Sequence, residues 1–326
     1  MDRRNFLKTA GLASGAALLS GVLPDGAVRA AADVSHTVKQ DSLLKGVCDL
    51  HIHAAPDTKN RTVNELELCR MAKDVGYKTV MFKSNVWSCH DRAYLLCQEL
   101  PDFPCFGSLV MNLAFGEKVN VYAARLALNT SGNLCRCIWM PTQNAAYPPT
   151  VEANHPGKTI AVVDTAGNVL PEVVQVMELC AEADIIFATG HSSPAECLVM
   201  ARKAKEIGLG KFVITHANSR IWKLTHDQIK QAVDMGAWIE YCYLPRLWGP
   251  GTGLPSMERQ TTEEFLSYVR LVPERSYVST DLGSEGLPDP IEGMRMCIEE
   301  MVSFGVPQQE IDLLVRLNPA RLMKIS

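Results

Sequence analysis

The chain has 326 residues, of which 47% are hydrophobic and 21% charged, a balance typical of a folded globular protein and not of a disordered one. The formal net charge of -4 argues against a general nucleic-acid binder. Because no run of about 18 strongly apolar residues appears, we expect no stable membrane span in the mature protein.

The first thirty residues are typical of an export signal. Arg3 and Arg4 are followed by a mild run of Ala, Gly and Leu up to Leu23, and small residues near position 30 offer a cleavage site. We predict a twin-arginine signal peptide over 1–30, read by the twin-arginine (Tat) export machinery, and a polar leader over 31–46. The protein is then bacterial and periplasmic or otherwise exported. The alternative is an ordinary amphipathic first helix.

The chain contains 11 cysteines, which in an exported protein suggests disulfides. Most of them, however, lie in apolar strand-like runs or in helical patterns, where free cysteine behaves as a small hydrophobe. Cys135 and Cys137 are two residues apart and share a strand face, a spacing too isolated for a four-cysteine zinc site. We expect mostly buried thiols and leave one or two disulfides open.

After the leader, short β-rich runs alternate with helix-period segments. The β-rich runs are 47–53, 77–84, 105–112, 135–142, 185–191, 211–217, 238–244 and 276–282. The helical segments are 65–75, 91–100, 117–128, 171–183, 194–207, 226–235, 261–272 and 290–304. First-turn prolines, N-cap threonines and terminal glycines mark several of these helices: Pro171, Pro194, Thr225, Thr261, Gly76, Gly208, Gly236 and Gly305.

Repeated strand-helix units imply parallel strands joined by crossover helices. Their number and size match a closed (β/α)8 TIM barrel, an α/β fold of about 250 residues, over 47–326 as a single domain. An open doubly wound sheet is the alternative, but no glycine-rich phosphate loop follows the first strand. Two long connections lie over the strand ends: 143–170, with a small hairpin insertion at about 158–171, and the Gly- and Pro-rich segment 245–260.

Metal-ligating side chains gather where the predicted strands end. His51 and His53 close the first strand and, being two apart, point the same way. His191 closes the fifth strand, His216 the sixth and Asp281 the eighth. Neutral imidazoles joined by a carboxylate are typical of a catalytic metal site at the C-terminal ends of the strands. We predict one or two divalent ions, with Zn²⁺ as the leading candidate.

This arrangement, with its HxH pair, two further histidines and final aspartate, resembles the ligand pattern of the amidohydrolase superfamily. The resemblance covers about 47–322, and the ending NPARL at 318–322 is also similar to the close of such chains. It implies a metal-dependent hydrolase, in which a metal-activated water attacks an amide, ester, lactone or similar bond of a small molecule.

The resemblance also implies roles for the individual residues. His51 and His53 would hold a first metal together with Asp281. His191 and His216 would hold a second metal, or one of them would polarise the substrate in a one-metal enzyme. Asp281 would take a proton from the attacking water and pass it to the leaving group, so Asp281 and His216 are the catalytic candidates.

One position departs from the superfamily pattern. Many two-metal members bridge the ions with a carboxylated lysine or a glutamate after strand four, whereas strand four here ends in WMPT at 139–142. Lys83, at the end of strand two, has three interpretations: a carboxylated bridging metal ligand, a cation that binds a substrate carboxylate or oxyanion, or a surface lysine with a solvated ammonium.

Other candidates have equally open interpretations. Asp49 either orients a histidine or fills the barrel. Arg246 and Trp248 on the long seventh connection either hold an anionic or aromatic substrate or contact solvent. Glu240 and Tyr243 lie on opposite faces of strand seven, so at most one of them points inward.

Two further functions compete with hydrolysis. A metal-dependent decarboxylase uses similar ligands and needs a cation such as Lys83 for the substrate carboxylate. A non-catalytic exported metal- or ligand-binding barrel would keep the metal without turnover. The absence of a G-x-S-x-G motif disfavours a Ser-His-Asp hydrolase. Self-association into a homo-oligomer is an expectation by analogy with such barrels.

Overall fold

The computed structural model describes residues 41–147 and 157–325. The predicted signal peptide over 1–30 and the leader up to residue 40 therefore lie outside the described residues. The described residues belong to the compact unit Val38–Ser326. None of their helices is long and apolar enough to cross a membrane.

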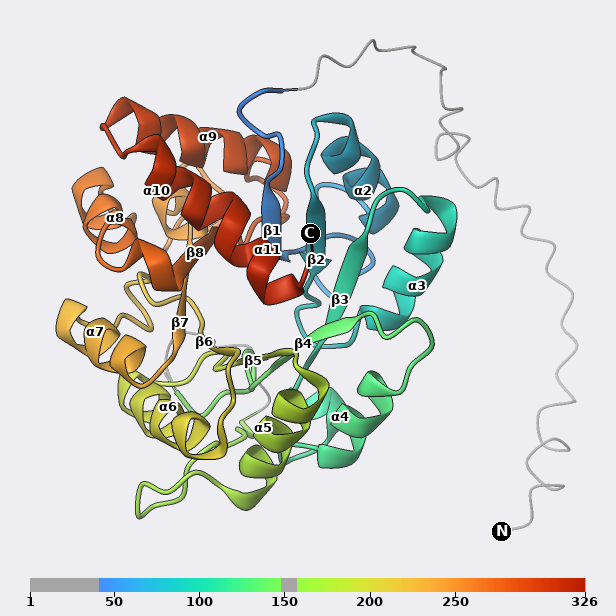
Figure 1. Ribbon diagram of the computed structural model, residues 1–326, viewed down its shortest axis with the longest axis vertical. Coiled ribbons are helices and arrows are strands. Elements are labelled where there is room, and N and C mark those ends of the chain that lie inside the picture. Colours follow the sequence, from blue (N-terminus) through green and yellow to red (C-terminus); the bar gives the residue numbers. More distant parts are fainter. Residues whose placement is uncertain (1–40, 148–156, 326) are drawn as a thin grey trace, which may run out of the picture. The chain divides into compact units, whose positions relative to one another are not determined.

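Eight parallel strands form one sheet whose spatial order is the chain order, β1 to β8 (Figure 1). The strands are β1 (Cys48–Ile52), β2 (Thr79–Phe82), β3 (Cys105–Val110), β4 (Cys135–Trp139), β5 (Ile186–Ala188), β6 (Phe212–Ile214), β7 (Trp238–Cys242) and β8 (Ser276–Ser279). Each lies within its predicted run. Short runs of this kind are typical of parallel strands that are buried on both faces.

The first and last strands of this order meet just beyond their ends. The amide of Asp281 donates to the carbonyl of His51 (2.8 Å), and the amide of His53 donates to the carbonyl of Leu282 (2.9 Å). These bonds bring the sheet to a nearly closed barrel and confirm the predicted (β/α)8 fold. They also join the backbone of the predicted HxH segment to that of the predicted aspartate.

Helices surround the strands in chain order (Figure 1). They are α2 (Glu65–Asp74), α3 (His90–Glu99), α4 (Val121–Leu128), α5 (Pro171–Ala183), α6 (Pro194–Ile207), α7 (His226–Asp234), α8 (Thr262–Val269), α9 (Pro290–Ser303), α10 (Gln308–Asp312) and α11 (Asn318–Met323). Short 3₁₀ turns lie at Leu113–Phe115 (η1), Leu244–Leu247 (η2) and Pro273–Arg275 (η3), and a π-helical turn, η4 (Leu313–Leu317), joins α10 to α11.

The helix-end signals are confirmed at most positions. Thr225 and Thr261 cap α7 and α8 with their side chains, and Gly208 ends α6 in the left-handed conformation. The start predicted at 117 is wrong: α4 begins at Val121, because Asn120 accepts the amide of Ala123 as the N-cap. The C-terminal α10 and α11 were not predicted.

The core has two parts. One lies between the strands and the surrounding helices. The other fills the barrel interior, where Leu50, Met81 and Trp139 pack in the same cluster as Leu322 and Met323 of α11. Helix α11 lies in front of the strands in Figure 1 and covers the end at which they begin. The opposite end, where the strands finish, is left for the site.

The 11 cysteines are all free, and ten of them are buried, which confirms the expectation of core thiols. The sulfur atoms of Cys97 and Cys105 lie 3.6 Å apart without a bond. Near the expected insertion, Val163 and Val169 form an isolated antiparallel bridge closed by a bond from the Asp164 amide to the Asn168 carbonyl.

Candidate metal centre

The predicted metal ligands lie together at the C-terminal end of the barrel. His51 belongs to β1 and His53 follows it, while His191, His216 and Asp281 follow β5, β6 and β8. All four imidazoles are buried, and Asp281 is nearly so. Parallel strands carry their C-terminal ends to one edge, so the topology makes this meeting possible.

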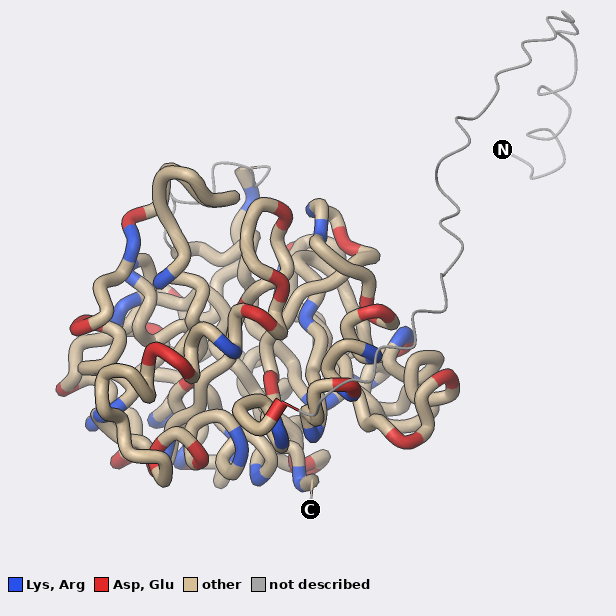
Figure 2. Tube along the Cα trace, turned by 90° about the horizontal axis from the view of Figure 1, so that it is seen from above, with Lys and Arg blue, Asp and Glu red and all other residues tan. Residues whose placement is uncertain are grey.

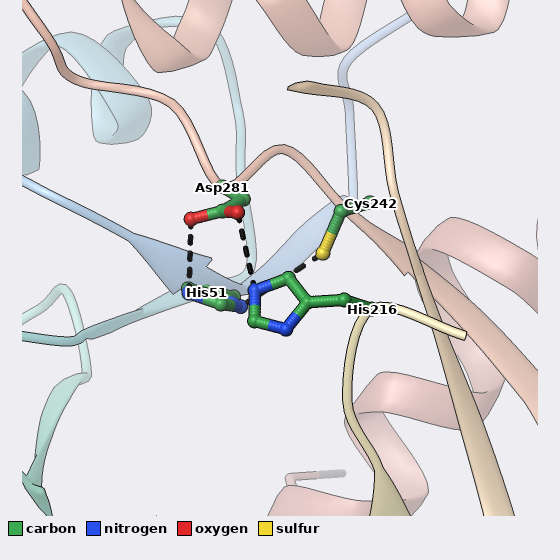
Figure 3. A group of neighbouring side chains, drawn as sticks. All are labelled: His51, His216, Cys242 and Asp281. Atoms are coloured by element: carbon green, nitrogen blue, oxygen red, sulfur yellow. Dashed lines mark hydrogen bonds and ion pairs between the residues drawn. The ribbon is translucent and has the colours of Figure 1, made fainter. Parts of the chain in front are cut away.

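The carboxylate of Asp281 is the centre of this group. Its Oδ1 lies 3.0 Å from Nε2 of His51 and 3.1 Å from Nε2 of His53, and its Oδ2 lies 3.2 Å from Nε2 of His216. Figure 3 shows His51 and His216 pointing toward Asp281 from different strands. One carboxylate, that of Asp281, thus contacts the rings of both His51 and His216.

The backbone around these side chains has unusual conformations. His216 and Asp281 both have left-handed φ, +54° and +56°, which costs on the order of 1–3 kcal/mol for a residue other than glycine. The pairing of β1 with β2 also shifts register between Asp49 and Ile52, a bulge that turns the local strand around His51. Simple alternation therefore does not describe how His51 and His53 come to face one carboxylate.

Two glycines permit close passage of the chain at the site. Gly190, with φ of +60°, precedes His191, and a Cβ there would lie 2.3 Å from the Met140 carbonyl oxygen. Gly283, with φ of +128°, follows Asp281, and a Cβ there would lie 1.8 Å from the His53 carbonyl oxygen. A side chain at either position would push a ligand-bearing segment away.

The electrostatics of the group favour neutral imidazoles at three positions. Burial holds the pKa of His53 well below its usual range, helped by the positive charge of Arg61. Burial likewise lowers the pKa of His191, aided by His216, and that of His216, against the opposing pull of Asp281. Neutral imidazole is the form that ligates metals.

His51 and Asp281 behave differently from these three. Burial opposes the charged form of His51, but Asp281 and Glu240 together raise its pKa to about 9. Burial would favour a protonated Asp281, yet His51, His216 and His53 hold the pKa of its carboxyl well below its usual range. Asp281 is therefore ionised, and its negative charge faces Nε2 of all three imidazoles.

Glu240 in β7 is a site residue that the sequence left undecided. It is fully buried, and both its oxygens lie 3.3 Å from Nδ1 of His51. Tyr277 also donates its hydroxyl to Glu240 (3.4 Å). A carboxylate on the far nitrogen of a histidine fixes the ring so that Nε2 faces the ligand side. Tyr243 points the other way, to Glu300 of α9.

Cys242 was not among the predicted ligands. One atom each of His51, His216, Cys242 and Asp281 lies within 4.8 Å of the others, a set that could hold a metal ion (Figure 3). The Cys242 sulfur lies 3.9 Å from Nδ1 of His51. The available signal was the spacing of two residues from Glu240, which gives the two side chains one strand face.

The residues present fit a divalent transition metal. Nε2 of His51 is buried and has no aligned hydrogen-bond partner among the described residues, although Asp281 is near. Imidazole, thiol and carboxylate groups within one small volume form the donor set that Zn²⁺ and related ions prefer.

Lys83 follows β2 and is only 4% exposed, so its interpretation as a surface lysine is wrong. Its Nζ lies 5.4 Å from the centre of the Trp139 ring. Burial lowers the pKa of Lys83, although Asp281 and Asp57 oppose this effect. The two inward roles, a metal bridge and a contact with substrate, remain as alternatives.

Asp49 and Arg246 serve the framework of the barrel. Asp49 accepts the hydroxyl of Thr280 (2.6 Å) and the backbone amides of Thr280 and His51, so it does not contact a histidine ring. Arg246 pairs with Glu300 of α9 (2.7 Å), which excludes it as a free anchor for a substrate.

A cavity of about 200 Å³ opens beside the centre. His53, His191, His216 and Asp281 line its floor together with Lys83. The ring of Trp222, from the segment after β6, covers His191 at 4.0 Å and His216 at 5.0 Å between ring centres. The candidate ligands therefore face a small, partly aromatic chamber at the position where TIM barrels carry their active sites.

A family model described as a family of unknown function, DUF6282, matches residues 46–240. The chain belongs to the DUF6282 family. The region that matches this family includes all four predicted histidine ligands and Lys83, and it ends before Cys242 and Asp281. No curated protein matches the chain.

Solved structures with a similar fold include an amidohydrolase from Pseudomonas aeruginosa (TM-score 0.59, 9% identity, covering 86% of this chain and 97% of that one). The probable dipeptidase PvdM from the same organism has a TM-score of 0.57 at 11% identity, covering 87% and 97%. A 2,6-dihydroxybenzoate decarboxylase has a TM-score of 0.51 at 12% identity, covering 86% and 99%. These likenesses confirm the predicted (β/α)8 barrel fold for this DUF6282 member.

Proposed function

We propose that this protein is a metal-dependent hydrolase that cleaves an amide, ester or lactone-type bond of a small molecule. The observation that carries the proposal is the contact of one ionised carboxylate, Asp281, with Nε2 of three buried imidazoles. Asp281 and two of these imidazoles, His53 and His216, line a cavity. Structural packing alone does not require such a concentration of ligand groups at the strand ends.

His51, His53 and Asp281 are the proposed ligands of a first ion, and His191 and His216 those of a second, with Zn²⁺ as the leading candidate. When bound, such an ion supplies Lewis acidity, which polarises a carbonyl and lowers the pKa of water toward neutrality. In a one-ion enzyme, one of His191 and His216 polarises the substrate directly. Glu240 keeps Nε2 of His51 directed to the ligand side.

Asp281 moves the proton in this mechanism. Its oxygens lie at the floor of the cavity, so one of them accepts a proton from the attacking water and delivers it to the leaving group. Because its pKa is held low, Asp281 is a weak base and acts as a shuttle. Trp222, whose ring lies tilted against those of His191 and His216, shields this step from bulk water.

Metal content tests the proposal. The protein is purified without chelator beside a His51→Ala/His53→Ala double variant, and metal per chain and hydrolysis of a panel of esters, lactones and N-acyl amino acids are measured. One or two ions per chain with turnover, both lost in the variant, are expected. An absence of metal after supplementation with zinc, manganese or iron overturns the proposal.

Decarboxylation is the second candidate, because the cations Lys83 and Arg61 line the same cavity and are suited to a substrate carboxylate. Release of carbon dioxide from carboxylates, without hydrolysis of the panel, would select it.

Export to the periplasm, proposed from residues 1–30, is tested by fractionation after replacement of Arg3 and Arg4 by lysine, which should leave the precursor inside the cell.

A further inference from the structure

We propose that the cavity binds a small molecule with a carboxylate at one end and a flat apolar body at the other, and that Lys83 pairs with the carboxylate. This inference rests on the proposed function, because it concerns the substrate of the same site. Its basis is a cavity lining that combines cationic side chains with aromatic and aliphatic ones.

The cationic wall consists of Lys59, Arg61 and Lys83. Arg61 is fixed, because its guanidinium pairs with Asp57 (2.6 Å) and donates to Ser284 (3.1 Å). The ammonium of Lys83 has no hydrogen bond and no ion pair with any of the described residues. It is a buried charge whose N–H donors are unused, and it lines the chamber.

The acidic groups nearby are already engaged. Asp281 contacts three imidazoles, and Asp57 accepts from Arg61 and from the backbone amide of Asn85. Neither carboxylate lies within ion-pair distance of Lys83. A buried ammonium without an anionic partner is costly, so an anionic ligand group is the chemistry that this wall lacks.

The cavity lining also includes apolar side chains, which form its apolar wall. It consists mainly of Ile221, Trp222, Leu244, Trp248, Leu254 and Met257. The indole nitrogens of Trp222 and Trp248 are buried without an acceptor among the described residues, so the unsatisfied groups of both walls are donors. At about 200 Å³, below the roughly 300–1,000 Å³ typical of drug-sized pockets, the space suits a body of about one ring.

The surroundings of Lys83 favour the ammonium over a carboxylated bridge. Its Nζ lies over the ring of Trp139 at 5.4 Å from the centre, and the face of an indole attracts cations. Carboxylation would place an anion over the same negative face. The position therefore stabilises a positive charge, which a bridging ligand does not carry.

The test compares benzoate with benzamide, a neutral molecule of nearly the same shape. Calorimetry and tryptophan fluorescence give the dissociation constants for wild type, Lys83→Met, Lys83→Arg and the surface control Lys230→Met, and metal per chain is measured for each. We expect wild type to bind benzoate at least about tenfold more tightly than benzamide, because only benzoate offers a charged carboxylate for a charge-assisted hydrogen bond with Lys83. Lys83→Met should remove that preference and leave metal content and benzamide binding unchanged, whereas Lys83→Arg and Lys230→Met should keep the preference.

Three other outcomes overturn the inference. Equal binding of the two probes by wild type, or unaltered benzoate binding by Lys83→Met, means that Lys83 does not recognise the carboxylate. Loss of metal from both Lys83→Met and Lys83→Arg identifies a bridge instead, and the proposed hydrolase then stands without this inference. Charge-dependent benzoate binding by a protein that never takes up metal refutes the proposed function alone.

Discussion

At the scale of single residues, the centre depends on side chains that hold one another in place. Asp281 faces three imidazole nitrogens, and His51 lies between Asp281 and Glu240. Replacement of either Asp281 or Glu240 therefore changes both the charge of the site and the orientation of a neighbouring imidazole ring. Two substitutions separate these effects.

Asp281→Asn keeps the shape of the side chain and removes its capacity to accept a proton. We expect kcat to fall by at least about a thousandfold, with much of the metal retained, because proton transfer and transition-state charge stabilisation are lost together. Steady-state kinetics and metal analysis check this, with the exposed Asp227→Asn as control. Full activity in Asp281→Asn would remove this residue from catalysis.

Glu240→Gln tests the orientation of His51. The neutral amide of the new glutamine has no full negative charge to attract the proton on Nδ1 of His51. We therefore expect metal affinity to fall about 10- to 100-fold, as is usual when such a hydrogen-bond partner of a metal ligand is removed. Competition with a chelator measures the dissociation constant. The exposed Glu263→Gln is the matched control, and an unchanged affinity in Glu240→Gln would show that His51 is oriented without it.

The sequence identified His51, His53, Lys83, His191, His216 and Asp281 as candidates because strand ends can be located from the strand-helix alternation, and the structure brings these residues to one end of the barrel. It left Glu240 undecided and missed Cys242. Both face the interior only because of the direction in which β7 enters the barrel, and two opposite faces of a buried strand are equally apolar in sequence.

At the scale of elements, the segment after β8 is held against the one after β1. Gly283 permits this contact, since its Cα passes directly over the His53 carbonyl. The bulge in β1 lies beside it. Strand and helix positions could be predicted from periodicity, but this bulge depends on pairing with distant strands, and α4 starts later than predicted because a single cap residue decides its first turn.

Gly283→Ala should disturb the site, because the added methyl group meets the His53 carbonyl at 1.8 Å and has no flexible side chain to displace. We expect a loss of stability of more than about 2 kcal/mol and weaker metal binding. Gly116→Ala is the control: Gly116 has a similar φ of +125° with no atom within 4 Å. Equal effects in thermal denaturation would assign the cost to the backbone conformation alone.

At the scale of the whole molecule, acidic and basic residues are interspersed along the described chain, and both signs appear over the trace in Figure 2. The partly buried pairs carry more weight than these exposed charges. Arg246 after β7 and Glu300 of α9 are one such pair, and Tyr243 donates to the same carboxylate (2.8 Å). This Arg246–Glu300 pair joins the long connection after β7 to α9 among the outer helices.

This pair predicts a pH dependence of stability. Burial would raise the pKa of Glu300, but Arg246, Thr262 and Tyr243 hold it below its ordinary value of 4.5. Stability from this group is therefore present above about pH 4.5 and is lost as the pH falls through the lowered folded-state pKa. Urea unfolding from pH 7 to 3 should show a decline that is smaller in Glu300→Gln, which is itself about 2 kcal/mol less stable at pH 7. The exposed Glu263→Gln should retain the wild-type slope.

The bonds between the segments after β1 and β8 also have a consequence for the life of the chain. His51 and Asp281 are 230 positions apart, and their backbones pair only when the last strand is in place. A nascent chain that has not yet been extended to residue 281 has the histidines without the Asp281 carboxylate. The complete set of proposed ligands is therefore a property of the finished protein, and uptake of the proposed ion would mark that synthesis and barrel closure are complete.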